Sequence, residues 1–153
     1  MDKKLPILIG LSLLTILAAG RVLADDANPH AKEHSTMRVH YVEIVSRDVA
    51  AQCAALEQLH GLSFGEVVAD LGNARVAEAP DGSRIGVRAP LAEHEQPIVR
   101  TYFEVADIER AAKEAEAAGA VLAYPPTRQG DTGTWAIYIL GDVQVGLWEG
   151  SKR

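Results

Sequence analysis

The chain has 153 residues, of which 48% are hydrophobic and 24% are charged, as is typical of one modest globular domain. The formal net charge is -6, and no stretch clusters the Lys and Arg that phosphate binding requires. Nucleic acid is therefore not an expected partner. The single cysteine, Cys53, excludes an internal disulfide framework.

Residues 1–24 resemble a targeting segment. Lys3 and Lys4 precede the apolar stretch 5–19, and residues 22–24 place small side chains where a signal peptidase cleaves. We expect a cleaved signal peptide and an exported protein, either periplasmic or secreted. The alternative is an uncleaved anchor, although the stretch is shorter than the roughly 20 apolar residues of a spanning helix. That segment is the only membrane contact we expect.

Residues 25–36 are polar and aperiodic, which predicts a flexible lead-in. His30 to His34 match the H-x-x-E-H string of inverted zinc peptidases. That chemistry needs a rigid helix, a further ligand and a cavity, so we interpret the match as chance that allows only weak metal binding. A further alternative places the true start at Met37.

The first of two similar units begins with a strand and a capped helix. Val39 to Val45 alternates as a strand does, Asp48 caps a helix that runs to His60, and Gly61 ends it. Three further strands are predicted: Phe64–Ala69, Ala74–Ala79 and Arg84–Ala89.

Cys53 lies within the predicted helix and is expected in the core. The residues that share its face of the helix are Val49, Leu56 and Leu59. A reactive thiol would need an electropositive, partly exposed site, and nothing near Cys53 in sequence suggests one.

A polar connection, Pro90 to Pro97, leads to a second unit of the same order. Asp107 caps its helix, which runs to Ala118, and Gly119 ends it. The other predicted elements are a strand at Val99–Val105, a strand at Ala120–Ala123, a loop through Pro125, Pro126, Gly130 and Gly133, and a hairpin of Trp135–Leu140 and Val143–Trp148. Neither unit can bury its apolar face alone, so we expect one domain over 37–150, with units at 38–89 and 98–149.

Alternation along the strands divides the side chains between two faces. One face is apolar and should lie under the helices: Val42, Ile44, Ile85, Val87, Phe103, Val105, Ile137, Ile139, Val143, Val145 and Leu147. The opposite face mixes arginines, carboxylates and aromatics: Tyr41, Glu43, Arg84, Gly86, Arg88, Arg100, Tyr102, Glu104, Tyr138, Gln144, Gly146 and Trp148. Such a mixture favours a pocket that holds a small molecule by planar ion pairs and stacking.

From about Val39 to Glu149 the chain resembles the vicinal oxygen chelate (VOC) superfamily of glyoxalase I, extradiol dioxygenases and bleomycin-resistance proteins. The stretches that carry the resemblance are Tyr102–Ile108, Ala117–Ala120, Pro125-Pro126, Gly133 and Gly146–Glu149. It is most similar to the glyoxalase-related subgroup. The resemblance implies an α+β fold in which two β-α-β-β-β modules form curved mixed sheets around a cavity.

Enzymes of this superfamily commonly hold a divalent metal through four positions, on the first and last strands of each module. Carried over by register from the capping aspartates, these positions fall at Tyr41, Gly86, Arg100 and Gly146. Glycine has no side-chain donor and arginine stays protonated, so we expect no metal and no cofactor. His40, adjacent to Tyr41, would point inward only after a one-residue slip that buries Glu43 in the core. We therefore predict that His40 is a strand-edge residue with a hydrogen-bonded ring.

The leading hypothesis is a metal-free small-molecule-binding protein whose pocket suits an acidic or aromatic ligand. Arg88 and Arg100 would grip a ligand carboxylate, and Glu43 or Glu104 would neutralise them in the empty protein. The predicted pocket walls are Tyr41, Tyr102, Tyr138 and Trp148.

Two other functions remain open. One is a lyase, isomerase or hydrolase in which Glu43 or Glu104 acts as general base, or in which a non-standard metal site operates. A close arginine would oppose the raised carboxylate pKa that such a base needs. The other is a homodimer that binds partners and has a vestigial pocket. The modules could pair within one chain or be exchanged between two.

Overall fold

The computed structural model describes residues 37–151. The predicted signal peptide, the predicted lead-in and the His30–His34 string lie outside the described residues. No helix within 37–151 has the length and hydrophobicity to span a membrane.

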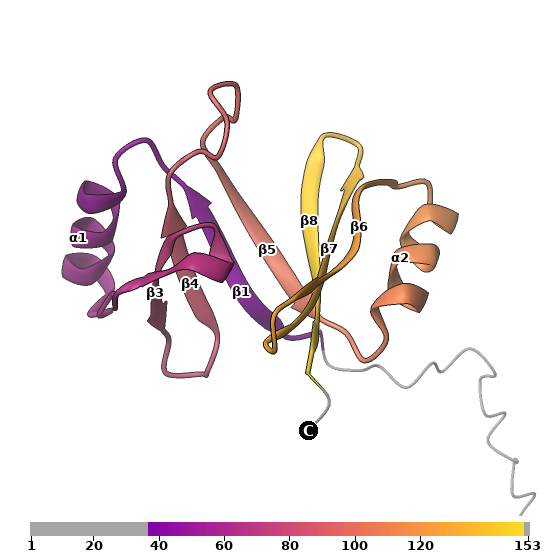
Figure 1. Cartoon of the computed structure of the whole chain (residues 1–153), viewed down its shortest axis with the longest axis horizontal. Helices are drawn as coiled ribbons and strands as arrows, with labels where there is room; N and C mark the ends of the chain where they lie inside the picture. The colour runs from indigo at the N-terminus through magenta and orange to yellow at the C-terminus, as the bar shows by residue number, and fades with distance from the viewer. Residues whose placement is uncertain (1–36, 152–153) are drawn as a thin grey trace, which may run out of the picture. The chain divides into compact units, whose positions relative to one another are not determined.

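The described residues form the predicted α+β fold (Figure 1). In chain order the elements are β1 (Val39–Val45), α1 (Val49–His60), β2 (Val67–Val68), the 3-10 helix η1 (Ala69–Leu71), β3 (Ala74–Glu78), β4 (Arg84–Arg88), β5 (Ile98–Glu104), α2 (Ile108–Ala117), β6 (Val121–Gln129), β7 (Gly133–Leu140) and β8 (Val143–Gly150). One mixed sheet has the order β2-β3-β4-β1-β5-β8-β7-β6. Two β-α-β-β-β modules are thus joined edge to edge through their first strands.

Both modules repeat the same pairing. The first strand of each pairs with its last strand in parallel, β1 with β4 and β5 with β8, while β1 and β5 pair antiparallel. Glu43 therefore lies directly opposite Arg100 and adjacent to Gly86. This register brings the first strands of both modules to the centre of the sheet, where the site described below is built.

The two capping aspartates perform the predicted role. The side chain of Asp48 accepts a hydrogen bond from the Ala51 amide at 2.9 Å, and Asp107 accepts one from Arg110 at 3.0 Å. Gly61 ends α1 in the left-handed conformation, at φ 66°, which only glycine adopts without strain.

Each helix covers the half of the sheet formed by its own module (Figure 1). Cys53 of α1 is buried against Phe64, Ala77 and Val87, and burial raises the pKa of its thiol. Its predicted place in the core is confirmed. The prediction for Leu59 is wrong, because its side chain is 73% exposed at the far end of α1.

Two segments differ from their predicted structure. Phe64 and Gly65 precede β2, which has only two residues and runs into η1, so the long second strand predicted there is wrong. The predicted loop through Pro125 and Pro126 is instead part of β6. A strand tolerates proline where no neighbour needs its amide, and β6 lies at the edge of the sheet with an irregular register to β7.

The predicted faces of β7 are interchanged. Ile137 packs with Tyr41, Tyr102 and Trp148 on the cavity face, whereas Tyr138 packs beside α2. The sequence of β7 is apolar at nearly every position, so alternation carries no signal that distinguishes its two faces.

Candidate functional site

A cavity of about 890 Å³ opens over the central strands. Its polar lining comes from β1, β4, β5 and β8 and from the connection between the modules, with Asp70 of η1 and Arg128 and Gln129 of β6. Aromatic side chains of Tyr124, Trp135 and Trp148 form part of the wall. Its size and its mixed lining are those of a small-molecule site.

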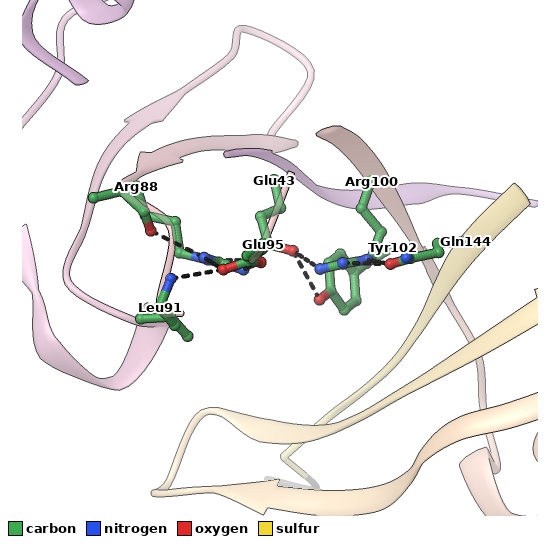
Figure 2. Close-up of polar contacts among 8 residues, drawn as sticks. Glu43, Arg88, Leu91, Glu95, Arg100, Tyr102 and Gln144 are labelled. Carbon is green, nitrogen blue, oxygen red and sulfur yellow. Dashed lines mark hydrogen bonds and ion pairs between the residues drawn. The ribbon is translucent and has the colours of Figure 1, made fainter. Parts of the chain in front are cut away.

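Glu43 is the centre of the polar lining (Figure 2). Its Oε1 accepts a hydrogen bond from Arg88 Nε at 2.6 Å, and its Oε2 accepts hydrogen bonds from Arg100 Nη1 and from the Tyr102 hydroxyl at 3.1 Å. Glu43, Arg88 and Arg100 are 7%, 4% and 6% exposed. One buried carboxylate is therefore shared by two buried guanidinium groups, an arrangement that is stable only when each charge is paired.

Arg88 has a second carboxylate partner, Glu95, which belongs to the connection between β4 and β5. Arg88 Nη1 donates to Glu95 Oε2 at 2.9 Å and Nη2 donates to Oε1 at 2.7 Å, while the Leu91 amide donates to Oε2 at 2.6 Å. Burial opposes the charge of Arg88, but its hydrogen bonds to Glu95 and Glu43 outweigh burial and raise its pKa. The hydrogen bonds from Arg88, followed by the one from the Leu91 amide, lower the pKa of Glu95 from 4.5 to about 2. Both groups are charged at neutral pH.

Arg100 differs from Arg88 because its outer edge has a neutral partner. Its Nε and Nη2 both donate to Gln144 Oε1, at 3.1 and 2.5 Å (Figure 2). Burial, followed by the charge of Glu43, raises the pKa of Tyr102, so that its hydroxyl stays protonated and donates. The row of polar groups thus runs from Glu95 through Arg88, Glu43 and Arg100 to Gln144.

Gly86 and Gly146 are sites of close packing. A Cβ on Gly86 would lie under 3.0 Å from the hydroxyl and ring of Tyr41, and one on Gly146 would lie under 3.0 Å from the ring of Tyr102. Tyr41 is buried behind the cavity, and its hydroxyl has no hydrogen-bond partner among the described residues. The glycines are therefore required by the tyrosine rings that lie against them.

His40 occupies a β-bulge, where the register of β1 against β5 shifts between Val39 and Tyr41. Its ring stacks on Trp148, with centroids 4.7 Å apart, and its Nε2 lies 3.0 Å from Arg84 Nη2. Because arginine only donates, this nitrogen accepts, which requires a neutral imidazole. Burial and the nearby Arg84 lower the pKa of His40, in agreement with that state. The predicted hydrogen-bonded ring is confirmed. The bulge turns the ring toward Trp148 without a one-residue shift in the register of the rest of β1.

The structure brings together five of the predicted site residues and leaves three aside. At the cavity lie Glu43, Arg88, Arg100, Tyr102 and Trp148. Tyr41 is buried behind it, and Tyr138 lies among the residues packed on α2, so its prediction as a pocket wall is wrong. Glu104 is also wrongly placed: its side chain is 43% exposed at the end of β5 and lies 3.8 Å from Arg38.

Sequence reasoning missed Glu95, Trp135 and Tyr124. Glu95 lies in a connection without periodicity, and the other two lie on strands whose face or extent was wrongly predicted. The signal that could have found Glu95 was charge: the predicted polar face carried the three arginines Arg84, Arg88 and Arg100 against two carboxylates, so a further acid was to be expected.

The four positions where the superfamily commonly holds a metal do not fit one here. Gly86 and Gly146 provide no donor, and a larger residue at either would collide with a tyrosine ring. Arg100 is a cation whose guanidinium is bound to Glu43 and Gln144. Within 37–151 no three His, Cys, Asp or Glu side chains are grouped as a metal would require.

Comparison with solved structures identifies the fold class. Methylmalonyl-CoA epimerase from Mycobacterium tuberculosis is similar with a TM-score of 0.60 and 18% identity, covering 74% of this chain and 88% of that one. A hypothetical protein from Bacillus halodurans C-125 is similar with a TM-score of 0.63 and 13% identity, covering 77% of this chain and 97% of that one. Streptomyces coelicolor methylmalonyl-CoA epimerase in complex with 2-nitronate-propionyl-CoA has a TM-score of 0.54 and 18% identity, covering 75% of this chain and 98% of that one.

The described domain therefore has the VOC, or glyoxalase, fold shared by these epimerases. Identities below 20% show the fold alone. No family model matches the chain, and no curated protein matches it.

Proposed function

We propose that the protein binds a small molecule that carries a carboxylate on a planar, apolar body, and that it does so without a metal. The observation that carries the proposal is the pair of buried arginines at a cavity with aromatic walls. Guanidinium groups recognise carboxylates through two parallel hydrogen bonds, and the partly exposed rings of Tyr124 and Trp135 offer aromatic surface for a ring.

An isomerase that uses Glu43 as general base is less well supported. Both oxygens of Glu43 already accept hydrogen bonds from two arginines and a tyrosine. These bonds occupy three of the roughly four acceptor sites of a carboxylate, so little capacity remains to take a substrate proton. The other candidate base, Glu104, does not line the cavity. Binding therefore leaves the hydrogen bonds of Glu43 in place, whereas catalysis would use the carboxylate that holds both arginines.

Thermal denaturation against matched pairs of small molecules tests this proposal. Each pair consists of an aromatic acid and its amide, such as benzoate with benzamide and 2-naphthoate with 2-naphthamide. A ligand that binds only the folded state raises Tm by mass action, so at least one acid should raise Tm while its amide does not. Equal shifts for acid and amide, or no shift with any acid in a panel of differing ring size, would contradict it.

A further inference from the structure

The contact between Arg88 and Glu95 has the geometry of an arginine that holds a ligand carboxylate. Two nitrogens of one guanidinium donate to the two oxygens of one carboxylate, at 2.9 and 2.7 Å. Glu95 comes from the connection between the modules and not from the sheet that carries Glu43 and both arginines (Figure 2). Its side chain is 21% exposed, whereas that of Arg88 is 5% exposed. The carboxylate is therefore the outer and more accessible member of the pair.

We propose that the outer edge of the Arg88 guanidinium is the subsite for the ligand carboxylate, and that Glu95 occupies it in the free protein until the ligand replaces it. This inference rests on the proposed function, because it assigns the atoms that would bind the acid.

Charge balance makes Glu95 and a ligand carboxylate mutually exclusive. With Glu95 in place, two guanidinium groups face two carboxylates and the buried cluster is neutral. A third carboxylate would add an unpaired negative charge to a buried site, which is costly. Once Glu95 leaves, Arg88, Glu43 and Arg100 together carry one positive charge. A ligand carboxylate then restores neutrality.

The same charge balance favours Arg88 over Arg100 as the residue that binds the ligand carboxylate. The outer edge of Arg100 is held by the neutral amide of Gln144, so a carboxylate that displaced this amide would leave Glu95 in place and overcharge the cluster. At Arg88 the exchange is one carboxylate for another.

The segment that carries Glu95 is built so that it can release this contact. Glu95 accepts from the Leu91 amide and donates its own amide to the Ala92 carbonyl at 3.0 Å, which closes a short turn. Leu91 is 67% exposed, and Leu91, Ala92 and Glu95 all line the cavity. Withdrawal of this turn would uncover the edge of Arg88 and leave the sheet intact.

Glu95→Gln tests the subsite, with benzoate as the probe and calorimetric titration of the full chain as the measurement. Glutamine keeps the shape and an acceptor oxygen but removes the charge that competes with the ligand. We expect benzoate to bind Glu95→Gln at least about tenfold more tightly than it binds the unmodified protein, since the competing group then forms only a neutral hydrogen bond. Benzamide should gain nothing. Circular dichroism before titration confirms that each variant is folded.

Glu93→Gln is the matched control, because it makes the same charge change two residues away on an exposed side chain that does not line the cavity. Its benzoate affinity should equal that of the unmodified protein. Benzoate that binds Glu95→Gln no better than Glu93→Gln overturns the subsite and leaves the proposed function standing. Benzoate and 2-naphthoate that bind none of the three proteins overturn both.

Discussion

Glu43→Gln is expected to lower the free energy of unfolding by about 3 to 5 kcal/mol, the cost of removing one partner from a buried ion pair. The substitution keeps the shape of the side chain and removes the carboxylate that Arg88 and Arg100 share. Glu95 would then remain as an anionic partner of Arg88, while Arg100 would have lost the carboxylate that it bonds. Urea denaturation followed by circular dichroism measures the change.

Glu104→Gln is the control for this loss. It changes the net charge equally, but Glu104 is exposed and its nearest cation, Arg38, is 3.8 Å away and also exposed. Exposed pairs contribute about 0 to 1 kcal/mol, so the change should be small. If the two variants lose equal stability, Glu43 is not the centre of a buried charge network.

Gly146→Ala is expected to cost about 1 to 3 kcal/mol, the range for forcing an extra methyl group into a packed interior. The new methyl would overlap the ring of Tyr102, which lies directly across from Gly146 in the β5–β8 pairing. Any shift of that ring also weakens its hydrogen bond to Glu43. The loss is measured in the same denaturation experiment.

Gly150→Ala provides the comparison on the same strand, since nothing lies within 4 Å of the added methyl. It should change stability by no more than about 0.5 kcal/mol. Placing Gly146→Ala in a Tyr102→Val background should remove most of the cost, because the colliding ring is gone. If Gly146→Ala still lowers stability in that background, glycine is required at this position by the backbone and not by the ring of Tyr102.

The sequence predicted the fold well wherever local signals were strong. The capping aspartates Asp48 and Asp107 located both helices, and β1 and β5, which precede them, have their predicted faces. Prediction was wrong where a strand was apolar on both sides, as in β7, or where prolines were tolerated because the strand lay at an edge, as in β6. Neither property can be read from one strand alone, because each depends on its neighbours in the sheet.

The candidate site was predicted in its centre and missed at its border. Glu43, Arg88 and Arg100 lie on strands with clear alternation, so parity alone directed them inward. Alternation could not identify Glu95, because this residue lies in a turn and not in a strand. Its pairing with Arg88 is a tertiary contact that the local sequence does not show. The prediction for Glu104 was wrong for a different reason. By alternation along β5 it belongs to the same face as Arg100 and Tyr102, but it lies at the end of the strand, outside the cavity.

The two modules share one architecture but carry different side chains at equivalent positions of their last strands. Gly86 and Gly146 occupy equivalent positions and both accommodate a tyrosine ring. At the positions two residues further along each last strand, module one has Arg88 and module two has Trp148. At this pair of equivalent positions the repeat thus carries a charged side chain in one module and an aromatic side chain in the other.

We expect the side chains of this cavity, and not a metal ion, to form the binding site. Elemental analysis of the purified protein, after dialysis without chelator, tests it most directly. We expect nickel, zinc, manganese and iron well below stoichiometric amounts, and a Tm that added metal does not change. A stoichiometric, tightly held transition metal whose removal lowers Tm would contradict it.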